Sequence, residues 1–315
     1  MGYNAKRRGQ SGPTSKAFAS DMWLFRKSVD ISRATPRRIS SNDLSATSRL
    51  LRDGARRYYG LLGGDLPALL AANHGLVLEV GSDLVAVVLV NWPTHATCWL
   101  RGAAFAEGVE TRAAAALLMP ALHRTLASHD IHTVYYAGEE AADAWLIPIL
   151  QTHGYASDTA VVVYEKTTLD LPTIGNLHVR IRPATKADLA GVVQLDQRCF
   201  EPQWTKNDLV LGPAIEQGPY FMVAELGPEL VGYAFATTHF GGRLVHLVRI
   251  AVDPARRSEQ IGVRLLAEVI THASAQQANV ITLNTQAYNT RAQRLYRWFG
   301  FVATGEHQPI LRCTL

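Results

Sequence analysis

A polar loop between an apolar strand and an amphipathic helix is the first place where this sequence could do chemistry. The strand ends at Asp253-Pro254, an arginine- and serine-rich turn follows, and the helix begins near Glu259 and continues to about Ala275. Such a loop directs several backbone N–H groups and the positive end of a helix dipole toward one point. The loop therefore predicts a site for a phosphate or pyrophosphate, with an ordinary helix start as the alternative.

A second set of polar residues follows in the next strand and helix. After a predicted strand over 280–285, Asn289, Ala292 and Tyr296 fall on one side of a helix by their i, i+3, i+7 spacing. One helix face can thus present an amide, a gap and a phenol to a ligand, ahead of Gly300-Phe301. A buried structural tyrosine is the alternative for Tyr296.

In this order and spacing, the two units resemble the acetyl-CoA-binding core of the GNAT N-acetyltransferase superfamily over about residues 178–315. In the family pattern Arg/Gln-x-x-Gly-x-Gly/Ala, backbone amides hold the CoA pyrophosphate, and Arg257 and Gly262 match it here. Ser258 and Gln260 stand where the family commonly has glycine. The resemblance implies acetyl-CoA as the acetyl donor. It implies cofactor contacts at Ile250, Ala251, Val252, Arg257, Ser258, Gln260, Ile261, Gly262, Val263, Asn289, Ala292 and Tyr296.

The resemblance also implies which residues move protons. Tyr296 would protonate the leaving thiolate, as the tyrosine at this point does in GNAT enzymes. Many relatives carry a glutamate as the base, but Asn284 occupies the position where ribosomal-protein-alanine acetyltransferases have one. The base therefore has to come from another strand.

His246 is the first candidate for that base. By strand alternation it shares a face with Val248, Ile250 and Val252, and it is similar to the strand histidine of serotonin N-acetyltransferases. A histidine with a pKa near neutral can accept the proton of the attacking amine. A histidine that only lines the sheet is the alternative. The reserve candidates are Glu225 and His239.

The acceptor is expected to contact the helices that precede the second strand. The segment Cys199-Phe200-Glu201-Pro202-Gln203-Trp204-Thr205 is similar to the F-x-x-P-W-S segment of the ribosomal-protein-alanine acetyltransferases, except that Gln203 separates Pro from Trp. The tandem arrangement described next is similar to that of mycothiol synthase. One likeness implies a protein N-terminus as acceptor and the other a small amine, and the sequence leaves both open.

The N-terminal half repeats the plan of the C-terminal half. Its predicted elements are helices 43–58 and 66–72, strands 75–80, 83–91 and 97–105, helix 109–128, strand 131–137, helix 140–153 and strand 159–165. For the C-terminal half we expect strands 178–183, 220–226, 230–238 and 244–252. Between the first two of these strands we expect two helices. One begins at a cap pair of Thr185 and Asp188 and ends at about 198, and the other begins at Trp204-Thr205 with a cap pair of Thr205 and Asp208.

The first copy lacks the residues that would bind a ligand. Setting Gly154-Tyr155 on Gly300-Phe301 places Leu150 at the position of Tyr296, and no Arg-x-x-Gly-x-Gly loop precedes the helix at Val109. The fold prediction is an α/β chain of two tandem GNAT-like domains, each a mixed sheet flanked by helices. We expect a non-catalytic domain over 37–167, a linker over 168–177 and the acetyltransferase domain over 178–315, with an unrelated α/β domain as the alternative for the first.

Composition bounds the remaining possibilities. The 315 residues suit two domains, and the net charge of +4 hides nine Lys/Arg against two Asp in residues 1–40. We expect residues 1–36 to form a basic disordered tail, for which contact with RNA or the ribosome stays open. The three cysteines lack metal-ligand spacing, which favours free thiols without a metal, and no membrane span or secretion signal is visible. These features predict a cytoplasmic protein.

Together, the sequence predicts an acetyl-CoA-dependent N-acetyltransferase that acts on a primary amine through its C-terminal domain. A catalytically silent acyl-CoA-binding or scaffold protein with the same fold is the main alternative, and Ser258, Gln260 and Asn284 favour it. A factor that binds RNA through its basic tail is a third possibility. The acceptor and the oligomeric state are left open.

Overall fold

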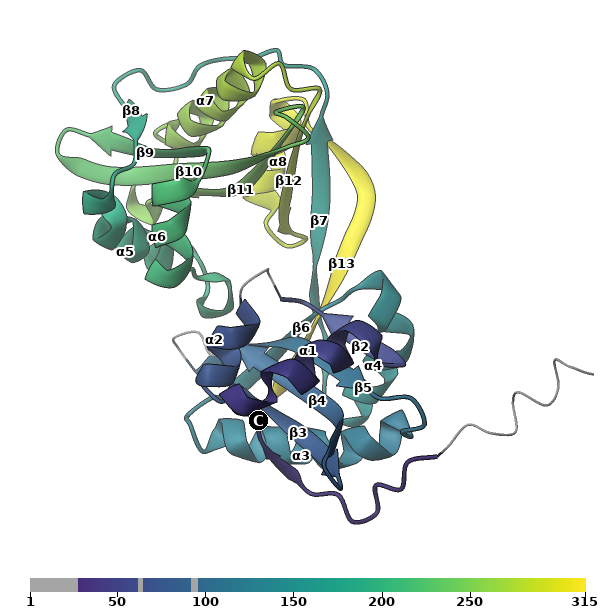
Figure 1. Cartoon of the computed structure of the whole chain (residues 1–315). Coiled ribbons are helices and arrows are strands. Elements are labelled where there is room, and N and C mark those ends of the chain that lie inside the picture. The colour runs from purple at the N-terminus through teal and green to yellow at the C-terminus, as the bar shows by residue number, and fades with distance from the viewer. Residues whose placement is uncertain (1–27, 62–64, 92–95) are drawn as a thin grey trace, which may run out of the picture.

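The protein has two lobes joined by two long strands (Figure 1). The computed structural model describes residues 28–61, 65–91 and 96–315. We call residues 28–155 the N-lobe and residues 167–301 the C-lobe. The N-lobe holds β1 (Pro36–Arg38), α1 (Leu44–Asp53), β2 (Arg56–Tyr59), α2 (Asp65–Ala71), β3 (Gly75–Val80), β4 (Asp83–Asn91), β5 (Thr97–Phe105), α3 (Thr111–Ala127), β6 (Thr133–Ala137) and α4 (Glu140–Thr152).

The C-lobe follows the same order of elements, except that no strand corresponding to β2 lies between its first two helices. It holds β8 (Arg180–Pro183), α5 (Leu189–Cys199), α6 (Asp208–Gln217), β9 (Tyr220–Leu226), β10 (Glu229–His239), β11 (Leu244–Val252), α7 (Ile261–Ala275), β12 (Val280–Gln286) and α8 (Thr290–Trp298). The joining strands are β7 (Ala156–Lys166) and β13 (Val302–Thr314), and short 3₁₀ turns span Ser41–Asp43, Lys186–Asp188, Pro202–Trp204 and Pro254–Arg256.

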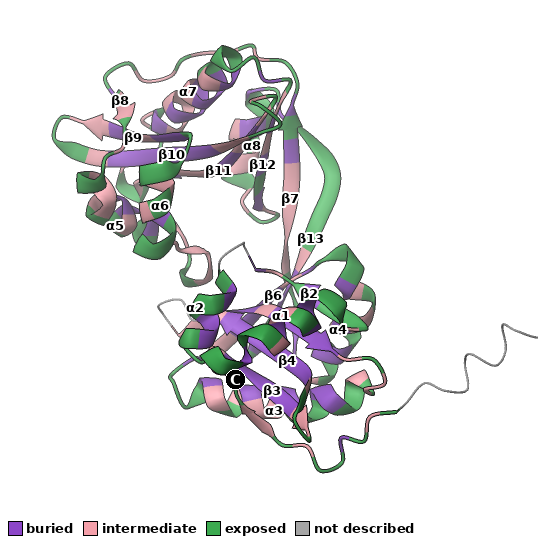
Figure 2. Ribbon diagram, viewed as in Figure 1, coloured by how far each residue is buried: buried purple, intermediate pink, exposed green. Residues whose placement is uncertain are grey.

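Helices cover both faces of the sheet in each lobe. In the N-lobe, α1 and α2 pack on one face and α3 and α4 on the other; in the C-lobe, α5 and α6 oppose α7 and α8. Strands β3 and β4 and most of β10 are therefore buried on both faces, as their purple ribbons in Figure 2 show. This explains the unbroken apolar run of β4, where residues 85–90 are all buried.

The last strand of each half completes the sheet of the other half. The strand order is β1-β3-β4-β5-β6-β13-β7-β12-β11-β10-β9-β8, with β2 paired to β5 outside this path. β13 pairs with β6 of the N-lobe through Ile310–Thr314, and β7 pairs with β12 of the C-lobe. Between the lobes β7 and β13 pair with each other, and the C-terminus consequently lies in the N-lobe (Figure 1). The expected domain boundary at residues 167–168 divides the sequence into two halves, but the sheet continues across both halves.

Most predicted elements are confirmed within two residues of their ends, and two are wrong. Residues 56–59 form strand β2 instead of continuing helix 43–58, because they pair with β5 and bury Tyr58. No helix starts at Trp204-Thr205: Pro202–Trp204 is a 3₁₀ turn, Thr205 Oγ1 donates to the carbonyl of Pro202 at 2.8 Å, and α6 begins at Asp208. The Thr185–Asp188 capping box is present as predicted.

The predicted tail is partly folded. Residues 1–27 lie outside the described residues. Residues 28–36 contradict the prediction, because Val29 N–H donates to the carbonyl of Gly108 at 2.9 Å and Ile31 is buried in the N-lobe core. Cys98, Cys199 and Cys313 are free thiols. In the described part of the chain, no helix has both the length and the apolar character that crossing a bilayer requires.

Candidate active site

The site of the C-lobe begins where two parallel strands separate. β11 and β12 pair only from Leu244–Val280 to Leu247–Leu283, and beyond that point the strands diverge. Residues Ile250–Val252 still pair with β10 on their other side. The edge of β11 that faces β12 therefore has no strand partner at these residues, and this edge can accept an extended ligand as an added strand. The carbonyl of Val252 accepts from the thiol of Cys199 at 3.2 Å.

A cavity of about 690 Å³ occupies this opening. All twelve residues that the sequence predicted as cofactor contacts line it, from Ile250–Val252 through the loop at Arg257 to the α8 face. Asn284 and the acceptor-segment residues Cys199, Phe200, Glu201 and Trp204 line it as well. The structure thus brings the predicted cofactor and acceptor segments together around one cavity.

The loop that leads into α7 keeps a glycine-like backbone without glycine. Ser258 has φ +86° and Gln260 has φ +58°, both in the left-handed region that favours glycine. Gln260 is the N-cap residue of α7, and its side chain makes no capping hydrogen bond. The first amides of α7 are thus available to a ligand at the positive end of the helix dipole.

The linker holds this loop in place. Asn176 Nδ2 donates to the carbonyl of Glu259 at 2.9 Å. Gly175 lies so close to α7 that a Cβ there would meet the amide nitrogen of Arg264 at 2.7 Å, and its φ is +74°. Only glycine fits this approach, so the linker sets the position of the α7 start.

Two residues of the α8 face have different roles. The side chain of Asn289 accepts from the amide of Ala292 at 3.2 Å and so caps the helix. Tyr296 is 4% exposed, lines the cavity and makes no hydrogen bond through its hydroxyl among the described residues. Burial raises the pKa of Tyr296 well above its ordinary value. The phenol therefore keeps its proton near neutral pH and can donate it.

The structure does not bring His246 to the cavity. His246 lies in the part of β11 that is still paired with β12, and its Nδ1 is 2.9 Å from the hydroxyl of Thr282. Burial, with a smaller contribution from the charge of His239, lowers the pKa of His246. Its place in the paired region separates it from the opening at Ile250–Val252.

A β-bulge reverses the strand alternation that placed His246 with Ile250. Two successive residues of β10 pair with Leu247 and Arg249, so Val248 is an extra residue in β11. Leu247 and Ile250 consequently pack on the α7 side, whereas Val248 packs on the α5 side. His246 precedes Leu247 and faces the α5 side, away from Ile250.

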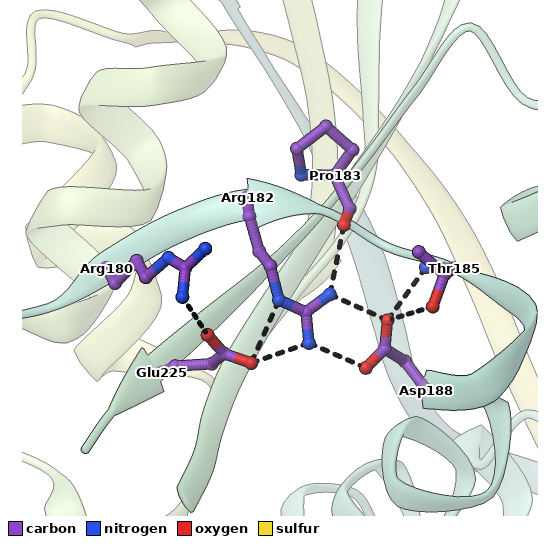
Figure 3. A network of polar contacts seen from close by, with 6 residues as sticks. All are labelled: Arg180, Arg182, Pro183, Thr185, Asp188 and Glu225. Atoms are coloured by element: carbon purple, nitrogen blue, oxygen red, sulfur yellow. Dashed lines mark hydrogen bonds and ion pairs between the residues drawn. The ribbon is translucent and has the colours of Figure 1, made fainter. Parts of the chain in front are cut away.

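The reserve candidates for the base also lie elsewhere. Glu225 is held by Arg182, whose Nε donates to it at 2.9 Å, and Arg180 approaches it at 3.9 Å (Figure 3). The same Arg182 pairs with Asp188 of the capping box at 2.7 Å. This network ties β8 and β9 to the start of α5. His239 is exposed at the end of β10.

Sequence reasoning missed the buried carboxylate that fixes the acceptor segment. Asp196 of α5 is 0% exposed and forms an ion pair with Arg249 at 2.7 Å. It also accepts hydrogen bonds from Tyr233 and from the amide of Lys206, the latter at 2.7 Å. Arg249 in turn donates to the carbonyl of Trp204 at 2.7 Å. An aspartate in the middle of an amphipathic helix was the available signal.

A chain of side chains continues from Trp204 along the cavity wall. Trp204 Nε1 donates to the hydroxyl of Tyr288 at 3.1 Å, and this hydroxyl donates to Glu201 at 3.1 Å. From the N-lobe, Trp99 Nε1 donates to the carbonyl of Gln203 at 2.9 Å. The acceptor segment is therefore held by hydrogen bonds from both lobes. Glu201 places a carboxylate at the wall of the cavity.

Comparisons with known proteins agree with this geometry. Residues 189–301 match the acetyltransferase (GNAT) family. The spore coat polysaccharide biosynthesis protein SpsD of Bacillus subtilis is 32% identical over 101 residues, and the matched part covers 32% of this chain and 32% of SpsD. The match thus spans about a third of the length of this curated relative.

Solved structures extend the likeness to both lobes. A GCN5-related N-acetyltransferase from Kribbella flavida has a TM-score of 0.67 at 16% identity, covering 90% of this chain and 71% of that one. A tandem GNAT protein from the clavulanic acid biosynthesis pathway has a TM-score of 0.56 at 12% identity, covering 89% of this chain and 98% of that one. Residues 189–301 of the C-lobe are therefore similar to the acetyltransferase (GNAT) family, and the whole chain shares the fold of these GNAT structures, a tandem one among them.

Proposed function

We propose that the protein is an acetyl-CoA-dependent N-acetyltransferase that acts on a primary amine. The observation that carries the proposal is the meeting of three features at one cavity: the unpaired edge of β11, the uncapped start of α7 and the buried phenol of Tyr296. The match of residues 189–301 to the acetyltransferase (GNAT) family supports the same reaction.

The residues present fit acetyl-CoA. The edge at Ile250–Val252 suits the amide groups of the pantetheine arm, and the amides at the start of α7 suit the pyrophosphate. Gly262 lines the cavity beside these amides, next to Leu295 and Val252. When bound, acetyl-CoA would supply an activated acetyl group as a thioester.

The residues of the chain have separate tasks in this reaction. Tyr296 holds a proton at its hydroxyl and delivers it to the departing sulfur. Trp204 and Arg249 form the wall between the cofactor groove and the acceptor. For the base, we propose Glu201 ahead of the predicted His246, because Glu201 lines the cavity and His246 does not. Direct attack by the amine needs a group of this kind within reach, or a water between them.

We also propose that the N-lobe is not catalytic. Its strand β2 pairs with Gly102–Phe105 of β5, which is the edge that corresponds to the open edge of β11. At the start of α3 the side chain of Glu110 accepts from the amides of Arg112 and Ala113. The N-lobe thus fills both positions where a CoA ligand would bind.

The alternative of a silent acyl-CoA-binding protein loses part of its support. It rested on Ser258, Gln260 and Asn284, of which Ser258 and Gln260 keep the left-handed backbone that a glycine would adopt. Asn284 still favours the silent protein, since it lines the cavity without a carboxylate. Calorimetry with acetyl-CoA on the whole chain should give one site per chain. Turnover of small amines and N-terminal peptides, followed by release of free CoA, then separates enzyme from binder, and binding without turnover of any amine would favour the silent protein.

A further inference from the structure

A second cavity, of about 460 Å³, lies between the two lobes. We call it the interlobe cavity. Its N-lobe wall includes Trp99 and Arg101 of β5, and its C-lobe wall is the segment Gln203–Lys206. Trp204 and Arg249 line both this cavity and the cofactor groove. The two cavities therefore adjoin at these two side chains, and a molecule in the interlobe cavity can approach the end of the groove.

Two cationic side chains face the interlobe cavity without an ionic partner. Arg101 comes from the N-lobe and Lys206 from the C-lobe. Within the described residues, neither side chain forms a hydrogen bond or ion pair with an acid, and the described contact of Arg101 is with the ring of Trp99 at 5.8 Å. Arg249 differs, because its charge is neutralised by Asp196. The acid that lines this cavity is Glu139, whose carboxylate accepts from the amide of Tyr59 at 3.4 Å.

A β-bulge in β5 accounts for the direction in which the side chain of Arg101 points. Two successive residues of β4 pair with Leu100 and Gly102, so Arg101 is the extra residue of a β-bulge in β5. Bulges re-aim a side chain at the cost of a ladder pair. On the other side, Asp196 holds the amide of Lys206 at 2.7 Å and so fixes the backbone that carries this lysine.

Arg101 and Lys206 are half-buried, and two like charges near each other at a half-buried site are unfavourable unless an anion joins them. The pKa values of Arg101 and Lys206 both reflect this unfavourable environment. Burial lowers the pKa of Arg101, and burial with the nearby charge of Arg249 lowers the pKa of Lys206 to about 8. The charge of Asp65 partly opposes the effect of burial on Arg101, and Glu139 is the acid that lines the cavity. Arg101 and Lys206 therefore bring two positive charges to the cavity, and within the described residues neither charge is held in an ion pair.

We propose that the interlobe cavity binds the anionic group of the acceptor, with Arg101 and Lys206 as its ligands. This inference rests on the proposed N-acetyltransferase function and names its substrate class: a small amine that also carries a carboxylate or a phosphate. The volume of about 460 Å³ suits a small molecule. The N-lobe, which has no cofactor groove, then supplies one half of the acceptor site.

Inorganic sulfate tests the site without any need for turnover. Calorimetry on the whole chain, saturated with CoA to occupy the pyrophosphate loop, should show one sulfate site. A Gly262→Asp background gives the same test without CoA. Arg101→Gln and Lys206→Gln should each weaken sulfate binding roughly tenfold, whereas Arg101→Lys and Lys206→Arg should retain most of it. The control Lys186→Gln changes an exposed lysine paired with Glu216 and should have no effect.

Matched acceptor amines test the link to the reaction. Glucosamine 6-phosphate against glucosamine probes a phosphate, and β-alanine against propylamine probes a carboxylate. Arg101→Gln should raise KM roughly tenfold for the preferred anionic amine with kcat little changed, and should leave its neutral counterpart unaffected. Equal sulfate affinity in Arg101→Gln, Lys206→Gln and the parent would overturn the proposal. It would also be overturned if Arg101→Gln raised the KM for neutral amines or uncharged peptides as much as the KM for the anionic amines. If no amine is acetylated, the proposed function fails, and the sulfate titration still decides the site.

Discussion

Each lobe has an opening in its sheet at the equivalent position, but the two openings are filled differently. In both, the two central parallel strands pair for a few residues and then separate, after Trp99–Tyr135 in the N-lobe and after Leu247–Leu283 in the C-lobe. In the N-lobe, the hydroxyl of Tyr58 lies 3.2 Å from the carbonyl of Leu100 on β5 and 3.3 Å from that of Ala137 on β6. Tyr58 thus bridges the opening that the C-lobe leaves free.

The comparison shows how one fold can fill with its own residues the positions that it leaves open in its second copy. Strand β2 replaces the extended arm of a ligand along β5, and Glu110 replaces an anion at the start of α3. Both replacements satisfy backbone groups that a ligand would otherwise satisfy. In the proposed function, the N-lobe therefore needs no ligand of its own, and it contributes the wall that carries Arg101.

The largest expected effect is on cofactor binding. Gly262→Asp should abolish acetyl-CoA binding, because it places a carboxylate where the α7 amides meet the cavity, and like charges repel strongly at short range. The matched change in the N-lobe is Arg112→Asp, two residues after the N-cap of α3. It should leave the affinity within about twofold, a difference of less than 1 kcal/mol. Calorimetry on both variants checks the pair, and loss of binding in Arg112→Asp would contradict the assignment of the site to the C-lobe.

The next effect is on turnover. Tyr296→Phe should reduce kcat roughly 10²–10⁴-fold, because it removes the proton donor, while acetyl-CoA binding stays nearly unchanged. The N-lobe control is Tyr155→Phe. The hydroxyl of Tyr155 is buried with no partner among the described residues, so its removal should leave kcat unchanged. Steady-state kinetics on a confirmed acceptor makes the comparison, and parent-like turnover in Tyr296→Phe would remove its catalytic role.

The contributions of Lys206 and Arg101 to sulfate binding should differ in their dependence on pH. Lys206 has a pKa lowered to about 8, whereas Arg101 stays charged far above that pH. Lys206 is faced by Arg249, Asp196 and Arg101, and the cavity also contains Glu139. Because the charged lysine exists below pH 8, sulfate affinity should fall as the pH rises through about 8.

Lys206→Arg gives the control for this titration. An arginine keeps its charge, so the variant should bind sulfate with little change between about pH 7 and 9. Calorimetry at several pH values with CoA present measures both curves. The same fall in the parent and in Lys206→Arg would assign the titration to another group.

The smallest effect concerns the loop residue that departs from the family pattern. Gln260→Gly should keep or slightly tighten acetyl-CoA affinity, because glycine adopts the observed φ of +58° without strain. The unfolding free energy should change by less than about 1 kcal/mol, since relief of strain offsets the greater freedom of glycine in the unfolded chain. Calorimetry and denaturant unfolding measure the two quantities. A large loss of affinity would mean that the Gln260 side chain itself contacts the ligand.

Local pattern and family resemblance predicted the cofactor groove because its residues are close in sequence. The loop at Arg257 and the face of α8 each depend on spacing within one element, and all of these residues line one cavity. The misplaced residues depend on features that spacing does not record. A single extra residue at Val248 turned His246 to the other face, and β2 formed because its partner β5 was available.

The site between the lobes could not be predicted from either half alone. Arg101 and Lys206 are distant in sequence, and nothing in their neighbourhoods marks them as partners. The exchange of β7 and β13 was equally hidden, because the predicted strand pattern does not say which sheet each strand joins. Only the pairing of whole strands brought these groups together.

The exchanged strands also determine when this protein can finish folding. The N-lobe is made first, but its sheet lacks the strand beside β6 until residues 310–314 arrive at the very end of the chain. Until then β6 has an exposed edge, which another chain can pair with. Such long-range pairing slows folding and makes the incomplete chain prone to swap strands with a second copy. Removal of the last few residues should therefore damage the first lobe to be synthesised more than the lobe that matches the GNAT family.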